Sequence, residues 1–412
     1  MCNTKLRLGA VPKRVSHRIT KLELGVTAMQ PFQINVPQYV LDDLQQRLAN
    51  TRWPDELEDA GWDYGTNQTY LRQLAAYWQT GYDWRAQEAK LNEFAQFKAE
   101  VAGLGIHFIH IEGKGPNPVP LLLTHGWPDS FFRMVKLIPL LTDPAAHGGR
   151  AEDAFTVIVP DLPGYGFSDK PKEAGYDPKR MADVLHELMT SVLGYKQYVA
   201  HGGDWGSSIT EQLALRHADA LLAIHLTDVP STHVKTADKL PDLSAAEKAF
   251  VLKSKVWQEK EAGYQKIQGT KPETLAYGLN DSPVGLLGWI IEKFHAWSDN
   301  DGNIEHTFLK DDLLTNVMIY WVTQTIGSSV RLYYEAMHSP TLGAPTHVKV
   351  PTGFAIFPED IAPAPREFAE RFFTVQHWQE IPRGGHFAAL EQTGLLAADL
   401  REFIRPLRSR MR

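Results

Sequence analysis

The stretch Gly202-Gly203-Asp204-Trp205-Gly206 follows the apolar run Tyr198-Val199-Ala200 and carries the strongest signal in this chain. Its G-x-D-x-G pattern has the shape of a nucleophile elbow, a sharp turn from a strand to a helix whose small flanking residues leave the central side chain exposed. The usual elbow holds a serine in a G-x-S-x-G pattern, and no such pattern occurs anywhere in the sequence. A serine esterase is therefore not expected, and Asp204 is the candidate nucleophile.

An aspartate at this turn suits a different reaction from a serine. A carboxylate is ionised at pH 7, so it attacks without a base to deprotonate it. When it displaces a leaving group from a saturated carbon it forms an ester, which water can cleave later, whereas a serine would form an ether that water does not cleave. The predicted substrate therefore reacts at an sp3 carbon, as an epoxide or an alkyl halide does. Alone, the motif is weak, because glycines around an aspartate usually mark only a turn.

The composition excludes several classes of protein. Apolar residues make up 43% and charged residues 22% of the 412 residues, which are globular values. The net charge of -7 argues against a nucleic-acid surface or an anionic membrane as partner. Cys2 is the only cysteine, so disulfide scaffolding, thiolate catalysis and cysteine-based zinc sites are excluded. No stretch approaches the ~18 apolar residues that span a bilayer, so no transmembrane anchor is expected.

The pattern of the sequence divides the chain into five segments. Residues 1–28 are basic and lack a continuous hydrophobic core, so we expect a disordered leader and a cytoplasmic protein rather than a secreted one. Residues 29–95 show helical spacing and no strand alternation, which predicts an N-terminal helical strap. Residues 96–234 and 341–412 carry short apolar runs separated by helical stretches, which is typical of an α/β fold with a mostly parallel sheet. Residues 235–340 lose the strand rhythm and predict a helical cap over the carboxyl edge of that sheet.

Chemistry-bearing residues follow directly after the predicted strands. In open α/β sheets, ligands bind at the carboxyl ends of parallel strands, so this shared position strengthens the interpretation of the elbow. The clearest predicted strands are residues 120–123, 155–159, 198–200, 353–357 and 378–381. The loops that follow them are His125-Gly126-Trp127-Pro128, Asp161-Leu162-Pro163-Gly164, the Asp204 elbow, Pro358-Glu359-Asp360 and Arg383-Gly384-Gly385-His386.

Hydrolysis of an aspartyl ester needs a base and a group that orients the base. His386 follows the last predicted strand, so nucleophile precedes histidine in the chain, and two glycines before it let the loop bring the imidazole to Asp204. A carboxylate must hold the tautomer of this histidine. Asp360 and Glu359 both follow the preceding strand, and sequence spacing alone does not separate them.

Two further groups of donors are required by the proposed chemistry. The backbone N–H groups of Trp205 and Trp127 are the candidates for stabilising the oxyanion that forms when water attacks the ester. Opening an epoxide also requires a proton for the departing oxygen, and a phenol near pKa 10 remains protonated at neutral pH. Several tyrosines lie in the predicted cap, and the residues alone do not choose among Tyr264, Tyr277, Tyr320, Tyr333 and Tyr334.

Over nearly its whole length, from about Pro31 onward, the sequence resembles the microsomal-type epoxide hydrolases. The motifs that carry the resemblance are Leu44-x-x-Arg47-Leu48, Thr51-Arg52-Trp53-Pro54, Tyr82-Asp83-Trp84-Arg85, His125-Gly126-Trp127-Pro128, Gly203-Asp204-Trp205-Gly206, residues 279–286 and residues 383–389. The family's acid lies fourth in a Phe-Pro-x-Asp/Glu motif, here Phe357-Pro358-Glu359-Asp360, so the resemblance selects Asp360. Its two cap tyrosines fall at residues 263–268 and 328–333, which selects Tyr264 and Tyr333.

The chain departs from the family pattern in two places. Some members begin with a membrane-anchoring helix, and we expect none in this chain. The residues after Pro128 include Asp129 and Arg133, where many members have a glycine and an acid. This second departure concerns the geometry of the loop and leaves the oxyanion donor Trp127 in place.

Together the residues and the resemblance predict an α/β-hydrolase core, with a cap and a strap, that hydrolyses an apolar or aromatic epoxide to a vicinal diol. Asp204 would attack, Tyr264 and Tyr333 would donate protons, and His386, oriented by Asp360, would activate water. No cofactor or metal is required, and His107 and His110 would point to opposite faces of a strand, so they are not a metal pair.

Two other classes are weighed against this interpretation. The first is a haloalkane dehalogenase, which would need halide donors in place of paired phenols. The second is a non-catalytic ligand-binding protein on the same scaffold. The sequence also leaves a homo-oligomer open.

Overall fold

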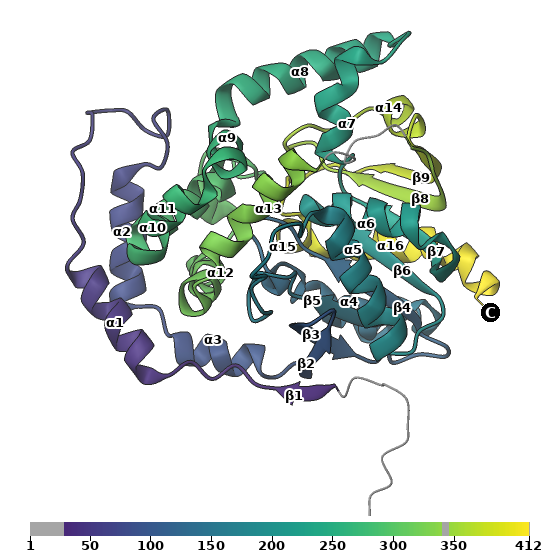
Figure 1. Cartoon of the computed structure of the whole chain (residues 1–412), viewed down its shortest axis with the longest axis horizontal. Coiled ribbons are helices and arrows are strands. Elements are labelled where there is room, and N and C mark those ends of the chain that lie inside the picture. The colour runs from purple at the N-terminus through teal and green to yellow at the C-terminus, as the bar shows by residue number, and fades with distance from the viewer. Residues whose placement is uncertain (1–28, 340–345, 412) are drawn as a thin grey trace, which may run out of the picture.

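The chain forms a nine-stranded sheet in the order β1-β2-β3-β5-β4-β6-β7-β8-β9 (Figure 1). This computed structural model describes residues 29–339 and 346–411, so the expected leader at residues 1–28 and Cys2 lie outside the described part. The strands are β1 (Gln30–Phe32), β2 (Gln96–Val101), β3 (Leu104–Ile111), β4 (Val119–Thr124), β5 (Phe155–Pro160), β6 (Tyr198–Gly202), β7 (Leu221–Leu226), β8 (Val348–Ile356) and β9 (Phe373–Glu380).

The sheet is mostly parallel, as the sequence predicts. The strands β5, β4, β6, β7, β8 and β9, which are neighbours in this order, pair in parallel. The strands β1, β2 and β3 add an antiparallel edge next to β5. Every residue of β4, β5, β6 and β7 is buried. Helices cover both faces of a central parallel sheet, which is why these strands appear in the sequence as continuous apolar runs.

The expectation that residues 29–95 contain no strand is wrong for β1. This strand has only three residues at the edge of the sheet, two of them exposed, so it leaves no apolar alternation in the sequence. The structure also contains β2, β3 and β7, which are not among the clear strands predicted from the sequence. The pairing of β2 with β3 in an antiparallel hairpin adds an edge that periodicity alone did not reveal.

The helices fall into three groups along the chain. An N-terminal strap contains α1 (Gln38–Ala49), α2 (Gln68–Thr80) and α3 (Trp84–Leu91). A helical insertion between β7 and β8 contains α7 (Ser231–Thr236), α8 (Ala245–Glu261), α9 (Gly263–Thr270), α10 (Pro272–Asp281), α11 (Pro283–Ala296), α12 (Lys310–Thr323) and α13 (Ile326–His338). The helices packed on the sheet are α4 (Leu137–Thr142), α5 (Pro178–Glu187), α6 (Trp205–Arg216), α14 (Arg366–Glu370), α15 (Ala388–Glu391) and α16 (Thr393–Ile404).

The strap is bonded to the helical insertion. Figure 1 shows α1 and α2 beside α10, α11 and α12, on the side of the molecule away from β8 and β9. The hydrogen bonds that join the two segments include Arg47 to Asp281 at 2.7 Å, Thr66 Oγ1 to the Gly288 carbonyl at 2.7 Å, Tyr77 to Asp311 at 2.8 Å and Tyr82 to Thr315 at 3.0 Å. The strap thus fixes one flank of the insertion.

A buried chain of histidines supports the strand that leads to the elbow. His201 on β6 bonds His225 on β7 through their Nδ1 atoms at 2.9 Å. The carboxylate of Asp399 on α16 accepts from His225 Nε2 at 2.7 Å and from His377 Nε2 on β9 at 2.6 Å. Burial raises the pKa of Asp399, but its bonds to the two histidines outweigh burial and lower the pKa to about 2. An ionised Asp399 therefore ties β7, β9 and α16 together behind β6.

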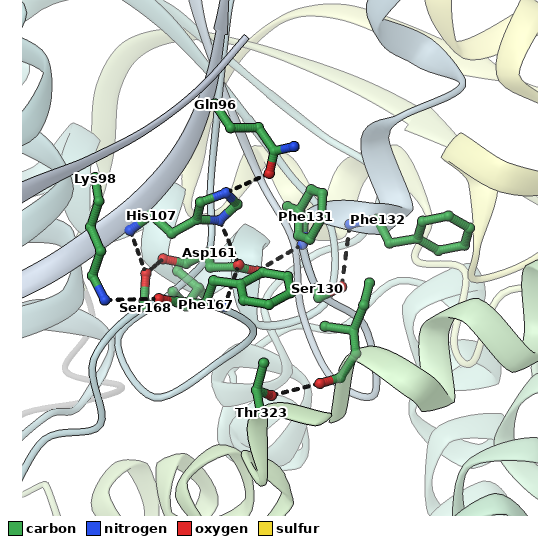
Figure 2. A network of polar contacts seen from close by, with 12 residues as sticks. Gln96, Lys98, His107, Ser130, Phe131, Phe132, Asp161, Phe167, Ser168 and Thr323 are labelled. Carbon is green, nitrogen blue, oxygen red and sulfur yellow. Dashed lines mark hydrogen bonds and ion pairs between the residues drawn. The ribbon is translucent and has the colours of Figure 1, made fainter. Parts of the chain in front are cut away.

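A second buried network fixes the loops that follow β4 and β5 (Figure 2). His107 on β3 bonds Asp161 Oδ2 at 2.8 Å and Gln96 Oε1 at 2.9 Å. The Asp161 carboxylate also accepts from the backbone N–H groups of Phe131, at 3.1 Å, and Phe167, at 2.8 Å. Because Asp161 bonds residues of both loops, it sets the position of the loop that carries Trp127.

Candidate active site

Most of the residues singled out from the sequence line one cavity at the carboxyl ends of the central strands. The cavity has a volume of about 790 Å³, including the space that opens to solvent. Its walls come from the elbow, from α7, α8, α9 and α13 of the helical insertion, and from the loops after β7, β8 and β9. The predicted residues in its lining are Asp204, Trp205, Tyr264, Tyr333, Asp360 and His386.

Asp204 lies at a sharp turn between β6 and α6. Its backbone has φ 58° and ψ -127°. Residues other than glycine seldom adopt this conformation, so the surrounding structure must hold it in place. The neighbouring glycines are sterically required: a Cβ on Gly202 would lie 2.2 Å from the Gly206 carbonyl, and a Cβ on Gly206 would lie 2.2 Å from the Thr124 carbonyl. A Cβ on Gly126 would lie 2.3 Å from the carboxylate of Asp204. The turn thus exposes a carboxylate where the backbone of another loop can approach it.

The loop after β4 supplies a donor to this carboxylate. The Trp127 N–H donates to Asp204 Oδ1 at 2.8 Å. Trp205 is the first residue of α6, and its N–H has no acceptor among the described residues. The amides of Trp127 and Trp205 therefore both lie beside Asp204, and only that of Trp127 is bonded to it.

His386 lies between two carboxylates. Its Nδ1 bonds Asp360 Oδ1 at 2.7 Å, and its Nε2 lies 3.5 Å from Asp204 Oδ2. Glu359, the other acid that spacing left open, is exposed and pairs through its backbone with the loop at Gly385. The geometry thus agrees with the choice of Asp360 that the family resemblance made.

The two carboxylates determine the charge of His386. Burial lowers the pKa of the imidazole, but Asp360 and Asp204 outweigh burial and raise the pKa to about 10. With both carboxylates ionised, His386 is therefore a cation at neutral pH. An imidazolium cannot accept a proton, so this histidine becomes a base only after one of its neighbours loses its charge.

Of the five tyrosines in the insertion, two reach the cavity. Tyr264 on α9 stacks on Trp127 with ring centroids 5.5 Å apart, and Tyr333 on α13 meets the Trp205 ring edge-on at 4.8 Å. The two phenol rings lie 5.8 Å from each other. Burial and the charge of Asp204 raise the pKa of both phenols, so both keep their protons at neutral pH.

The other three tyrosines do not line the cavity. Tyr277 and Tyr334 are 80% and 39% exposed. Tyr320 is buried and donates to the carbonyl of Asp129 at 2.6 Å. Tyr264 and Tyr333 are therefore the pair that lies within reach of a bound ligand.

The departure after Pro128 forms a buried ion pair beneath the site. Arg133 Nη1 bonds Asp129 Oδ2 at 2.5 Å, and its Nη2 donates to the backbone carbonyl of His386. Burial lowers the pKa of Arg133, but Asp129 and the nearby Asp204 and Asp360 outweigh burial, so the guanidinium stays charged. The charges of these two residues thus neutralise each other, and the loop after β4 keeps the bond from the Trp127 N–H to Asp204.

Two further carboxyl groups at the site were missed from the sequence. Glu391 accepts from the backbone N–H groups of Asp299, Gly385 and Phe387 at 3.0, 2.9 and 2.7 Å, which fixes the loop on both sides of His386. Asp228 lines the cavity beside the elbow. The signal for Asp228 was present, because it follows the apolar run that forms β7.

Comparisons with known proteins agree with this geometry. Residues 29–134 match a family model described as the epoxide hydrolase N terminus, and residues 119–246 match one described as the alpha/beta hydrolase fold. A protein named as an epoxide hydrolase in Stigmatella aurantiaca is 45% identical over 94% of this chain and 86% of its own length. Epoxide hydrolase 1 of Oryctolagus cuniculus is 38% identical over 92% of this chain and 89% of its own length. The crystal structure of juvenile hormone epoxide hydrolase from Bombyx mori superposes with a TM-score of 0.85 at 32% identity, covering 93% of this chain and 95% of that one.

The comparisons correct the expected compartment. The sequence led us to expect a cytoplasmic protein, but the mammalian relatives named Epoxide hydrolase 1 are microsomal enzymes. The expectation rested on the absence of a long apolar segment and of a secretory signal, and neither observation determines the compartment. Over residues 29–339 and 346–411, none of the helices combines the length and the apolar character that crossing a bilayer requires.

The fold class and the family predicted from the sequence are thus both confirmed. The core has the α/β-hydrolase fold, and the relatives span the strap, the core and the helical insertion alike. The chain belongs to the microsomal-type epoxide hydrolases, and it is a hydrolase.

Proposed function

We propose that this enzyme converts an epoxide to a vicinal diol through a covalent ester on Asp204. The observation that carries the proposal is the arrangement around one carboxylate: Asp204 faces His386 at 3.5 Å and shares its cavity with the phenols of Tyr264 and Tyr333. A nucleophile, a base and two proton donors therefore surround the same space.

In the first step, an oxygen of the Asp204 carboxylate attacks one carbon of the epoxide ring. A C–O ester bond forms, the ring C–O bond breaks, and its electrons go to the departing oxygen. Tyr264 and Tyr333 hydrogen-bond that oxygen and supply its proton, since both phenols are protonated at neutral pH. Charge grows on this oxygen in the transition state, so the two hydrogen bonds strengthen as the ring opens.

In the second step, His386 takes a proton from water and the resulting hydroxide attacks the ester carbonyl. Esterification of Asp204 removes one of the two charges that raise the pKa of His386, so the imidazolium gives up its proton at this stage, and that proton restores the phenol that protonated the substrate oxygen. Asp360 keeps the ring oriented and stabilises the imidazolium that forms again. The N–H groups of Trp127 and Trp205 stabilise the oxyanion, and its collapse releases the diol and restores the carboxylate.

We also propose which segments of the chain form the catalytic core, the cap and the strap. Residues 96–234 and 341–412 form the catalytic core, residues 235–340 form a cap that carries the two phenols, and residues 29–95 form the strap. The proposed substrate is an apolar or aromatic epoxide, because apolar side chains share the cavity with the polar groups. These include Val229, Val234, Trp257, Ile361 and Ala362. The proposed reaction uses water and the side chains of this chain alone.

The deciding experiment measures turnover on a panel of epoxides and haloalkanes while diol and halide are followed together. We expect diol from at least one apolar epoxide and no halide release. In Asp204→Ala we expect no diol, with the melting temperature retained. The control is Asp219→Ala, which removes an exposed carboxylate and leaves activity unchanged. Normal turnover by a folded Asp204→Ala protein would refute the covalent mechanism, and halide release without diol would make the enzyme a dehalogenase.

A further inference from the structure

Asp228 is a carboxyl group in the cavity to which the proposed reaction gives no role. It lies two residues beyond the end of β7 and lines the same cavity as Asp204, Asp360 and His386. Its hydrogen bonds indicate what it does.

One oxygen of Asp228 is an acceptor for the nucleophile's own backbone. Asp228 Oδ1 accepts from the Asp204 N–H at 2.9 Å and from the Ser207 hydroxyl at 2.7 Å. The hydroxyl of Thr227 lies 3.4 Å from the same oxygen. Oδ2 has no hydrogen-bond partner among the described residues. Asp228 therefore clamps the elbow at the amide of Asp204 and at the first turn of α6.

The elbow needs such a clamp because its backbone is strained. Asp204 has φ 58°, and a residue in this region stays there only when its surroundings hold it. The amide of Asp204 precedes the first turn of α6, so no carbonyl of that helix can accept from it. The side chain of Asp228 supplies the acceptor instead, and its bond fixes the plane of the peptide that ends at Asp204.

We propose that Asp228 is a positioning residue that holds the backbone of Asp204 so that its carboxylate points at the epoxide carbon. The proposal rests on the function proposed above and goes beyond it, because Asp228 acts through Asp204 and does not itself bond to the substrate. A displacement of about 1 Å at a reacting atom can cost about 10²-fold in rate, so loss of the clamp acts mainly on the attack.

The clamp works with or without a charge on Asp228. Burial first, and then the charge of Asp360, raise the pKa of Asp228 to about 7. Two or three donors converge on Oδ1, so the proton of a neutral Asp228 lies on Oδ2 and leaves Oδ1 free to accept. An asparagine places its amide oxygen in the same position, so it keeps the clamp while abolishing the titration.

The test measures the rate of ester formation on Asp204 in a His386→Gln background, where the ester accumulates. Rapid quenching and mass spectrometry of a styrene oxide adduct give the rate constant and its dependence on substrate concentration. We expect Asp228→Ala to lower the rate constant by about 10²-fold while apparent affinity changes by less than about 3-fold. Asp228→Asn should stay within about 3-fold of the parent rate, because the acceptor is retained. The matched control, Asp219→Ala, removes an exposed carboxylate that lies outside the cavity lining and should leave the rate unchanged.

Two results would overturn the proposal: an unchanged rate in Asp228→Ala, or an Asp228→Asn variant as slow as Asp228→Ala. If Asp228→Ala does not fold, Asp228→Leu fills the same space without an acceptor and is held to the same expectations. The parent His386→Gln protein separates this proposal from the one it rests on. If that protein forms no ester with any epoxide it binds, the proposed function fails. If it forms ester and Asp228→Ala forms it equally fast, only the positioning role fails.

Discussion

Replacing Asp399 with asparagine should destabilise the protein in a limited range of pH. The carboxylate accepts from His225 and His377 behind the strand that leads to the elbow. Its pKa is 3.8 ordinarily and about 2 in the folded protein. This difference corresponds to about 2.4 kcal/mol of stability at pH values where the group is ionised in both states.

The sign of the pH dependence follows from the two directions of the pKa changes. The pKa of Asp399 is lowered on folding, so its contribution is fully present above about pH 4 and is lost as the pH falls through about 2. The bond to Asp399 raises the pKa of His377 despite burial. The stability that the protonated His377 contributes is therefore fully present below pH 6.5, and it is lost as the pH rises through the pKa of His377 in the folded protein. The penalty of Asp399→Asn is therefore greatest between about pH 4 and 6.5.

Thermal melting monitored by circular dichroism provides the assay. At about 2 °C per kcal/mol for a large chain, Asp399→Asn should lower the melting temperature by about 5 °C near pH 5, and by clearly less near pH 9. The matched control is Asp183→Asn, since Asp183 bonds His217 at 2.8 Å but is 40% exposed, so its loss should cost less than about 1 kcal/mol. Equal losses for both variants, or a loss for Asp399→Asn that is the same near pH 5 and pH 9, would refute the reasoning.

Three further predictions concern the site. His386→Gln should form the ester on Asp204 but not hydrolyse it, so mass spectrometry should find the substrate's mass added to the protein; unmodified protein after long incubation with a known substrate would give His386 a different step. Tyr264→Phe and Tyr333→Phe should each slow ester formation by about 10²-fold or less, and together they should nearly abolish it in single-turnover measurements; a lower melting temperature with normal ester formation would make these residues structural. Arg133→Met should lower the free energy of unfolding by about 3–5 kcal/mol, because it leaves Asp129 buried without its partner. Adding Asp129→Asn should recover part of this loss, which a double-mutant cycle measures; additive losses would contradict the pairing.

The sequence predicted those parts of the structure that depend on local pattern. The central strands are buried on both faces, so their apolar runs were visible and the parallel core was confirmed. The strand β1 was missed because three edge residues carry no periodicity, and β7 was overlooked although its run was continuous. Overlooking β7 also hid Asp228, since a residue at the end of an unrecognised strand gives no sign that it faces the elbow.

The site divides in the same way. Asp204 and His386 could be proposed from the chemistry that their loops imply. The choice of Asp360 over Glu359, and of Tyr264 over its neighbours, needed the family resemblance, because side-chain direction at a loop or on a helix is set by tertiary packing. The pair of Asp129 and Arg133 was visible only as a departure. The two charges neutralise each other only because the side chains of these residues, four positions apart in a turn, meet beneath the loop.

The hydrogen bonds between the strap and the helical insertion limit how substrate can enter the cavity and how product can leave it. They reach α10, α11 and α12 at Asp281, Gly288, Asp311 and Thr315, and in the described part of the chain none reaches α8 or α9. We do not expect a helical insertion that is bonded along one flank to move as a rigid whole. We therefore expect substrate and product to pass on the side that the strap does not reach, where α8 contributes Ser254, Trp257 and Gln258 to the cavity wall and Glu247 of α8 bonds Arg371 of the core. Shortening the strap would remove its bonds to the helical insertion, and we expect this to alter the rate of product release without changing any residue of the site.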